Sequence, residues 1–218
     1  MLAPAGLAHA ERAANRSGNW HRERDRQCPP ATHQWPVARL PRKPGHRQAA
    51  RTEPENLLTT ENEITEIVSR YTRTADQRDG AAMAKLYEAD AVVEIHYRGP
   101  DGMQLLGTLS GQPQIEAAMS TPPKGAMAPH PPLGWSHHTT YDHLVSVDGD
   151  EASIETQFVT FDVAGARKPE GGWPAGTFGA QGTIKPIESG YYRFALRRTG
   201  GAWRIRHQDV IHDIPYVY

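Results

Sequence analysis

The feature that most limits the fold of this chain is a pair of predicted β-hairpins in its C-terminal part. Each hairpin consists of two apolar runs around a two-residue turn: residues 138–147 and 152–163 flank Asp148 and Gly149, and residues 191–198 and 203–211 flank Gly200 and Gly201. Asp-Gly and Gly-Gly pairs favour such turns because both turn residues adopt positive φ angles. The C-terminal part therefore predicts four antiparallel strands.

Three helices and two further strands are predicted before these hairpins. The first helix has an apolar face of side chains spaced three or four residues apart: Ile64, Ile67, Val68, Tyr71 and Ala75. Thr60 and Glu63 resemble a capping box at its start, and Asp79 can cap a short second helix. Strands over residues 91–97 and 103–109 follow, and then a third helix over residues 112–119.

Helices on one face of an antiparallel sheet make an α+β domain. If the sheet curls around the helices, the two layers enclose a pocket. Residues 164–189, which separate the two hairpins, are rich in glycine and proline. A loop of this length in a compact domain is often a lid or an interface segment.

Residues 1–55 differ from the rest of the chain in proline content and charge. They hold seven prolines, ten Lys or Arg and five Asp or Glu, whereas residues 56–218 hold 14 basic and 20 acidic residues. Such a segment buries too little apolar area to offset the entropy lost on ordering. We expect a disordered arm over residues 1–55 and a single domain over residues 56–218. A basic interaction arm or a targeting peptide is the alternative, and the acidic residues of the arm count against a targeting peptide.

Composition and charge argue against several protein classes. Because the basic excess lies in the arm and the domain is acidic, a nucleic-acid binder is not indicated. The sequence contains no run of 18 apolar residues that could cross a membrane, and its single cysteine, Cys28, has no partner for a disulfide. Since no signal-peptide pattern is present, we expect a cytoplasmic protein that binds neither nucleic acid nor membrane.

Several short strings, in this order and spacing, resemble the SnoaL-like branch of the nuclear transport factor 2-like superfamily: residues 71–79, 90–94, 136–138, 147–152, and 190–192 with 201–205. That superfamily includes polyketide cyclases, ketosteroid isomerase, scytalone dehydratase and bile-acid dehydratase. The resemblance covers about residues 60–212 and implies a cone-shaped, curved antiparallel sheet wrapped around N-terminal helices. It also implies a homo-oligomer, a dimer or a trimer, formed through the outer face of the sheet.

The resemblance singles out Asp76, which lies one residue beyond the apolar face of the first helix. A carboxylate near a buried face is costly unless it is paired. In the dehydratases that the chain resembles, an aspartate here pairs with a histidine from the sheet, and in bile-acid dehydratase a tyrosine lies five residues earlier, as Tyr71 does. The alternatives are a solvated carboxylate at a helix end for Asp76 and a core aromatic for Tyr71.

Two arguments disagree on which histidine would pair with Asp76. Strict alternation places His137 on the apolar side of its strand with Val145 and makes His138 point outward. The family pattern, counted back from the hairpin turn, selects His138. Both arguments hold only if a β-bulge near Tyr141 and Asp142 reverses the parity of the strand. We favour His138 and keep His137 as the alternative.

Other strand residues are candidates for the wall of a substrate pocket: Tyr97, Tyr141, Phe158, Tyr192 and His207. Core packing is the alternative for the aromatics, whereas His207 could be a second proton-transfer group near a strand end. The histidines show no metal-ligand spacing such as HExxH, so we expect no metal site, although a facial triad stays open. Without a GxGxxG motif, a P-loop or a nucleophile elbow, we expect no cofactor.

The resemblance implies a cofactor-independent dehydratase or isomerase that acts on a hydrophobic cyclic molecule, such as a polyketide, steroid or terpenoid. His138 would take a proton next to a carbonyl, Asp76 would orient the imidazole, and Tyr71 would donate to the developing oxygen charge. The alternative is a non-catalytic binding module or accessory subunit, like the β subunit of a ring-hydroxylating dioxygenase. A third hypothesis gives the function to the basic arm.

Overall fold

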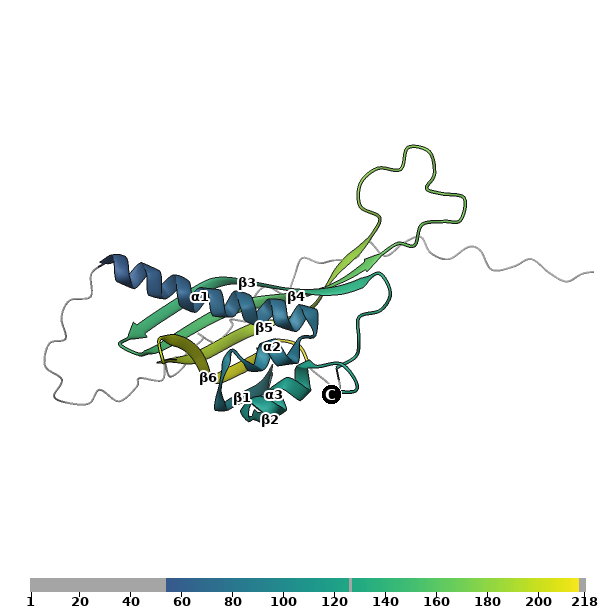
Figure 1. Ribbon diagram of the computed structural model, residues 1–218. Helices are drawn as coiled ribbons and strands as arrows, with labels where there is room; N and C mark the ends of the chain where they lie inside the picture. Colours follow the sequence, from purple (N-terminus) through teal and green to yellow (C-terminus); the bar gives the residue numbers. More distant parts are fainter. Residues whose placement is uncertain (1–53, 126, 216–218) are drawn as a thin grey trace, which may run out of the picture. The chain divides into compact units, whose positions relative to one another are not determined.

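The computed structural model describes residues 54–125 and 127–215 (Figure 1), so the arm predicted over residues 1–55 lies almost wholly outside the described residues. Its elements, in chain order, are α1 (Pro54–Gln77), α2 (Gly80–Ala84), β1 (Tyr87–Gly99), β2 (Gly102–Ser110), α3 (Gly111–Met119), β3 (Gly134–Asp148), β4 (Glu151–Gly165), β5 (Gly182–Thr199) and β6 (Ala202–His212). The strands form one six-stranded sheet in the order β2-β1-β6-β5-β4-β3. The fold class is α+β, as predicted.

Neighbouring strands of the sheet pair antiparallel, with one exception. β1 and β6 run parallel, with Val93 beside Gln208 and Glu94 beside Asp209. This pair joins the β1–β2 hairpin to the β3–β6 meander, so the sheet predicted as antiparallel is parallel at this one place. Figure 1 shows the three helices lying against one face of the curved sheet.

The core lies between α1 and the central strands. The predicted apolar face of α1 is buried, with Ile64 and Val68 fully inaccessible and Tyr71 at 8 % exposed. These side chains belong to one cluster with Phe194 and Leu196 of β5. Full burial of a large apolar side chain contributes roughly 1.5–3 kcal/mol, and this packing fixes where the last turn of α1 meets the sheet.

The start of α1 differs from the prediction. The helix begins at Pro54, where a proline in the first turn is tolerated, and Thr60 and Glu63 therefore lie inside it. Instead of forming a capping box, both side chains contact Arg198, at 3.3 Å and 3.5 Å from its Nη2. The predicted cap of α2 is present, because Asp79 Oδ1 accepts a hydrogen bond of 2.9 Å from the backbone N–H of Ala82.

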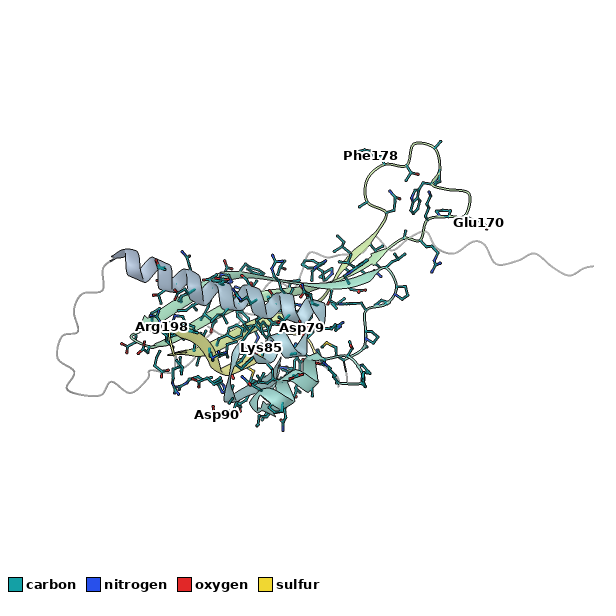
Figure 2. All side chains as sticks on the ribbon, viewed as in Figure 1. Asp79, Lys85, Asp90, Glu170, Phe178 and Arg198 are labelled. Atoms are coloured by element: carbon teal, nitrogen blue, oxygen red, sulfur yellow. The ribbon has the colours of Figure 1, made fainter. Side chains whose placement is uncertain are left out.

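The connection between β4 and β5 is shorter than the predicted loop over residues 164–189. The two strands continue to pair up to Gly165 and Gly182, so the loop spans residues 166–181. Pro186 lies at a shift in register next to Phe161, a place where a proline does not break the ladder. Figures 1 and 2 show this hairpin projecting from the sheet, with Phe178 near its tip at 96 % exposed.

Within residues 54–125 and 127–215, none of the helices combines the length and apolar character needed to cross a membrane.

Candidate functional site

A cavity of about 290 Å³ lies between the helices and the sheet. Most of its wall is apolar, and it is contributed by Met83, Val93, Ile95, Leu109, Ile115, Met119 and Val210. Polar groups enter the wall from several elements: Tyr71, Arg78, Ser136, His138, Thr160, Glu188, Tyr192, Gln208 and His212. An apolar cavity with a few convergent polar groups is typical of a small-molecule site.

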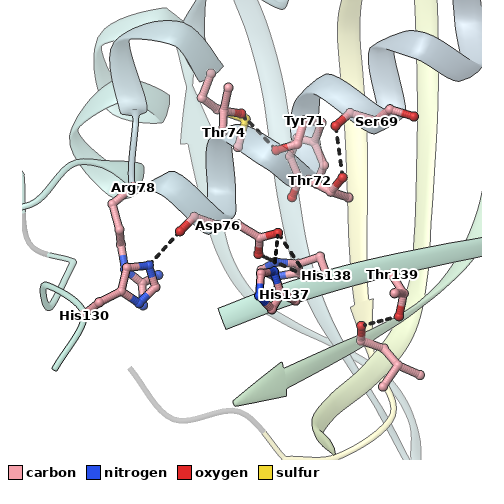
Figure 3. Close-up of polar contacts among 12 residues, drawn as sticks. Ser69, Tyr71, Thr72, Thr74, Asp76, Arg78, His130, His137, His138 and Thr139 are labelled. Carbon is pink, nitrogen blue, oxygen red and sulfur yellow. Dashed lines mark hydrogen bonds and ion pairs between the residues drawn. The ribbon is translucent and has the colours of Figure 1, made fainter. Parts of the chain in front are cut away.

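Asp76 and His138 form a hydrogen-bonded pair at the wall of this cavity (Figure 3). Asp76 Oδ1 lies 2.7 Å from the imidazole Nδ1 of His138 and accepts the backbone N–H of the same residue at 3.0 Å. Their side chains are 17 % and 14 % exposed. Because an ionised carboxylate only accepts hydrogen bonds, Asp76 favours the tautomer with the proton on Nδ1 and leaves Nε2 as the basic nitrogen.

The end of α1 places Asp76 behind His138, which lines the cavity. The helix ends at Gln77, and Arg78 then adopts a φ of 58°, which turns the chain toward α2. The ring Nε2 of His130 lies 2.6 Å from the carbonyl oxygen of Asp76. A carbonyl in the last turn of a helix has no partner within the helix, so His130 supplies one and ties the loop before β3 to the helix end (Figure 3).

A β-bulge in β3 decides between the two candidate histidines. The register of β3 against β4 shifts between Tyr141 and Leu144, and Thr156 Oγ1 donates a 2.8 Å hydrogen bond to the carbonyl oxygen of Tyr141. The bulge reverses the parity of the strand, so His138 faces the cavity. The side chain of His137 is 61 % exposed, with its Nδ1 3.9 Å from Asp76 Oδ2.

Tyr141 lies on the outer side of β3 and is 43 % exposed. The prediction that Tyr141 lines the pocket is therefore wrong, because the bulge puts His138 on the cavity side and Tyr141 on the other side of the strand.

Three aromatic side chains that the sequence singled out form one cluster beside the cavity. The Tyr71 and Tyr192 rings meet edge to face, with centroids 5.1 Å apart, and both line the cavity. Phe158 stacks on Tyr192 at 4.1 Å and is 1 % exposed, so it supports the wall from behind instead of forming part of it. Burial raises the pKa of Tyr192 well above 10.0, and nearby Tyr71 and Glu188 add to this rise. Tyr192 therefore remains a hydrogen-bond donor at neutral pH.

A second bulge, in β6, corrects the expectation for His207. Leu196 pairs with Ile205 but Ala195 pairs with His207, so Arg206 is the extra residue. Beyond it the parity reverses: Gln208 and His212 face the cavity, and the side chain of His207 is 39 % exposed on the opposite face.

The expectation for Tyr97 is also corrected. It is partly buried on β1, but the structure does not place it on the cavity wall.

His212 and Glu188 form a second histidine–carboxylate pair in the cavity, which the sequence analysis missed. His212 Nδ1 contacts Glu188 Oε1, and the two side chains are 5 % and 16 % exposed. Glu188 fell within the predicted loop. His212 could have been predicted to face the cavity only if the β6 bulge had been recognised in the sequence. The cavity thus carries one such pair from α1 and β3 and another from β5 and β6.

A model of the SnoaL-like domain matches residues 56–209 of the chain. The chain belongs to this family. Among curated proteins, none matches it significantly.

Solved structures share the fold of this SnoaL-like domain. The β subunit described for an aromatic-ring-hydroxylating dioxygenase of Novosphingobium aromaticivorans is 14 % identical, with a TM-score of 0.55 over 74 % of this chain and 94 % of its own. A variant of Rv3472, a protein of unknown function from Mycobacterium tuberculosis, is 20 % identical, with a TM-score of 0.52 over 77 % and 79 %. ActVI-ORFA of Streptomyces coelicolor is 16 % identical, with a TM-score of 0.50 over 71 % and 98 %. At such identities the likeness shows the nuclear transport factor 2-like fold alone.

Four buried polar atoms on the cavity wall of this SnoaL-like domain have no hydrogen-bond partner among the described residues: Arg78 Nε, Ser136 Oγ, Thr160 Oγ1 and Gln208 Nε2. The other end of the Gln208 amide is occupied, because the Tyr87 hydroxyl donates to its Oε1. Leaving a buried polar group unpaired costs about 1–3 kcal/mol. These four atoms therefore favour a ligand that brings its own polar groups into the cavity.

Proposed function

We propose that this SnoaL-like domain is a cofactor-independent lyase or isomerase that moves a proton next to a carbonyl group in a hydrophobic cyclic molecule. The observation that carries the proposal is the Asp76–His138 pair at the wall of a mostly apolar cavity. An imidazole held by a carboxylate is a general base, and general bases contribute typically ~10²–10⁴-fold in rate.

The first step breaks a C–H bond next to the carbonyl. His138 Nε2 takes the proton, and the electron pair moves onto the carbonyl oxygen as an enolate. The imidazolium that forms is stabilised by the Asp76 carboxylate 2.7 Å from its Nδ1. Tyr71, on the same cavity wall, donates a hydrogen bond to the developing oxygen charge.

The second step determines whether the product is a dehydrated or an isomerised ring. In a dehydration the enolate oxygen re-forms the carbonyl, and the electron pair of the enolate double bond expels a hydroxyl group from the next carbon. That C–O bond breaks, and the leaving hydroxyl takes a proton to become water. His212, paired with Glu188 on the cavity wall, supplies that proton as an imidazolium. Before the next turnover His138 releases its proton to solvent and His212 takes one up. In an isomerisation His138 returns its proton to another carbon of the ring.

The dimensions and polarity of the cavity indicate the substrate class. A volume of about 290 Å³ lies near the lower end of small-molecule pockets, which span about 300–1,000 Å³. Arg78, Ser136, Thr160 and Gln208 offer unpaired polar atoms along a mostly apolar wall. This combination suits a compact ring system with two or more oxygen substituents, of the polyketide, steroid or terpenoid type.

The experiment is hydrogen–deuterium exchange of cyclic ketones in D2O, read by NMR, with 2-tetralone and its ring-hydroxylated analogues as probes. For each ketone that binds, we expect the wild-type protein to incorporate deuterium at the carbon next to the carbonyl, and the Asp76→Asn variant to lose this activity. Binding without catalysed exchange in every case contradicts the proposal and favours a non-catalytic module.

The second candidate function is that of an accessory subunit, which the structural likeness to a dioxygenase β subunit supports. In such a subunit no reaction takes place in the cavity, and the Asp76–His138 pair only stabilises the fold. Asp76→Asn would then lower the melting temperature and leave a partner enzyme fully active.

We further propose that the domain works in the cytoplasm as a homo-oligomer, a dimer or a trimer, joined through the outer sheet face. Light scattering of the purified chain tests the subunit number.

A further inference from the structure

Four side chains of metal-ligand type gather on the face of the sheet opposite the cavity. Glu94 and His96 come from β1, and His207 and Asp209 come from β6. Side chains alternate along a strand, and the neighbouring residues Val93 and Val210 line the cavity. Because Glu94 and Asp209 are partners in the parallel β1–β6 ladder, the four side chains meet at one place.

Three of these side chains, Glu94, His207 and Asp209, offer ligand atoms that all lie within 4.8 Å of one another, and His96 approaches the two carboxylates from the other side. His207 Nε2 lies 3.1 Å from Asp209 Oδ1 and 3.7 Å from Glu94 Oε2. His96 Nε2 lies 3.6 Å from the same Asp209 oxygen and 3.8 Å from the same Glu94 oxygen. With bonds of about 2.0–2.1 Å, the ligand atoms around a tetrahedral zinc ion lie about 3.3–3.4 Å apart.

The charges at this place favour a cation. Glu94 and Asp209 are carboxylates directly opposite each other on neighbouring strands, and like charges in that position destabilise a sheet. Arg193 is the partner of Asp209 on its other side, but its Nε donates to Glu155 at 2.6 Å. A divalent ion between Glu94 and Asp209 would remove the repulsion and would remain open to solvent, since the four side chains are 18–39 % exposed.

We propose that Glu94, His207 and Asp209 bind one divalent transition-metal ion, with His96 turning in as the fourth ligand. Zn²⁺ fits this set best. Two imidazole nitrogens with two carboxylate oxygens suit zinc, whereas Mg²⁺ and Ca²⁺ prefer oxygen ligands alone. The ion joins β1 to β6, the parallel pair that connects the β1–β2 hairpin to the rest of the sheet. Its role is therefore to stabilise the sheet, and it is independent of the chemistry in the cavity.

A spacing motif could not detect this site, because the ligands come from two strands far apart in the sequence. Each strand contributes an alternating pair, residues 94 and 96 or 207 and 209, which is too short to stand out. The parallel pairing of β1 with β6 is what brings the two pairs together.

The test is titration of the untagged full chain with ZnCl2 by calorimetry, after dialysis against a chelator. We expect the wild-type protein to bind one zinc ion at this site and to melt at a higher temperature with zinc than without it. Asp209→Asn, nearly isosteric, should weaken the binding at this site at least tenfold, and His207→Ala should do the same. The matched control is Asp148→Asn, which removes an exposed carboxylate at the far end of β3 and should bind zinc like the wild type.

A second measurement separates a built site from adventitious binding. Cobalt(II) in a four-coordinate site of nitrogen and oxygen ligands gives visible absorption bands, and we expect them in the wild-type and Asp148→Asn proteins but not in Asp209→Asn. The proposal is overturned if the wild-type chain takes up no zinc, or if Asp209→Asn binds it as tightly and with the same cobalt spectrum.

Discussion

The Asp76 carboxylate holds His138 by two of its hydrogen-bond donors, the imidazole Nδ1 at 2.7 Å and the backbone N–H at 3.0 Å. The first contact sets the tautomer and the orientation of the ring. The second ties the carboxylate to the β3 backbone, so the pair does not depend on two mobile side chains finding each other. Because Asp76 comes from the last turn of α1, the contact also fixes the helix end against the sheet.

The first prediction concerns the charge of Asp76. Asp76→Asn keeps the shape of the side chain but removes the charge that stabilises the imidazolium, so turnover should fall by roughly 10²–10⁴-fold. The free energy of unfolding should fall by only about 1–2 kcal/mol, the scale of a lost charge-assisted hydrogen bond. Turnover assays and thermal melts of the same preparations measure the two effects.

The matched control is Asp79→Asn, three residues further along the chain, between α1 and α2. Asp79 caps α2 through the Ala82 N–H, and asparagine is an equally good cap. Turnover should stay at the wild-type level in this variant. A similar loss in both variants would mean that the end of α1 acts through stability alone.

The second prediction concerns His138 as the base. His138→Ala should lower turnover about as much as Asp76→Asn, and the double variant should be little worse than either single one, since groups that act as one unit are not additive. Imidazole added to His138→Ala should restore part of the activity by occupying the vacated place. Additive losses, with no rescue by imidazole, would separate the two residues.

The third prediction distinguishes the two adjacent histidines. The side chain of His137 is 61 % exposed and its Nδ1 is 3.9 Å from Asp76, beyond hydrogen-bond range. His137→Ala should therefore retain turnover within about threefold, because a screened charge near the surface has little effect on the pair. If His137→Ala is the inactive variant, the base has been assigned to the wrong histidine.

The two bulges show how far the sequence could predict this site. Asp142 takes the positive φ of 56° within the β3 bulge, and aspartate is among the residues that tolerate this conformation. The bulge that turns His138 inward therefore left a signal in the sequence. The β6 bulge has Arg206 as its extra residue, with no glycine, proline or aspartate to mark it, and strict alternation selected His207 in place of His212.

Local periodicity predicted the helices and strands, but it could not predict how strands far apart in the sequence pair. The stripe of Ile64, Val68 and Tyr71 identified α1, and the turn dipeptides identified both hairpins. The Gly200–Gly201 turn is confirmed, whereas the first turn consists of Gly149 and Asp150 because Asp148 still pairs with Glu151. The parallel pairing of β1 with β6 depends on the packing of the whole domain. It determines which side chains of these two strands meet, so neither the full cavity wall nor the cluster on the opposite face could be read from the sequence.

The fourth prediction concerns Gly190 on β5, where a side chain has no room. A Cβ atom at Gly190 would lie 1.8 Å from the Ile211 carbonyl oxygen and 3.0 Å from the Phe158 ring. Because the nearest atom is backbone, Gly190→Ala should lower the free energy of unfolding by at least about 2 kcal/mol. Gly107→Ala on β2, where a Cβ meets nothing within 4 Å, should change it by less than about 0.5 kcal/mol. Equal denaturation midpoints would show that β5 and β6 are farther apart at this point.

The fifth prediction is a loss of stability at high pH caused by the buried tyrosines. Burial raises the pKa of both Tyr87 and Tyr192 well above 10.0, whereas in the unfolded chain each tyrosine has a pKa of about 10. Below that pH the phenol protons stay bound in both states, so these groups do not make the free energy of unfolding change with pH. Above it the unfolded chain binds fewer protons than the folded one, so the free energy of unfolding falls as pH rises, by up to about 1.4 kcal/mol per pH unit for each tyrosine.

Urea denaturation at pH 8, 9, 10 and 11 measures this slope. Tyr192→Phe removes one of the two groups, so its free energy of unfolding should fall less steeply above pH 10 than that of the wild-type protein. Both proteins should behave alike between pH 8 and 9, apart from a constant offset for the lost hydroxyl. If the two curves stay parallel up to pH 11, the Tyr192 hydroxyl ionises as readily in the folded chain as in the unfolded one, and the wall of the cavity is wetter at this point than its burial indicates.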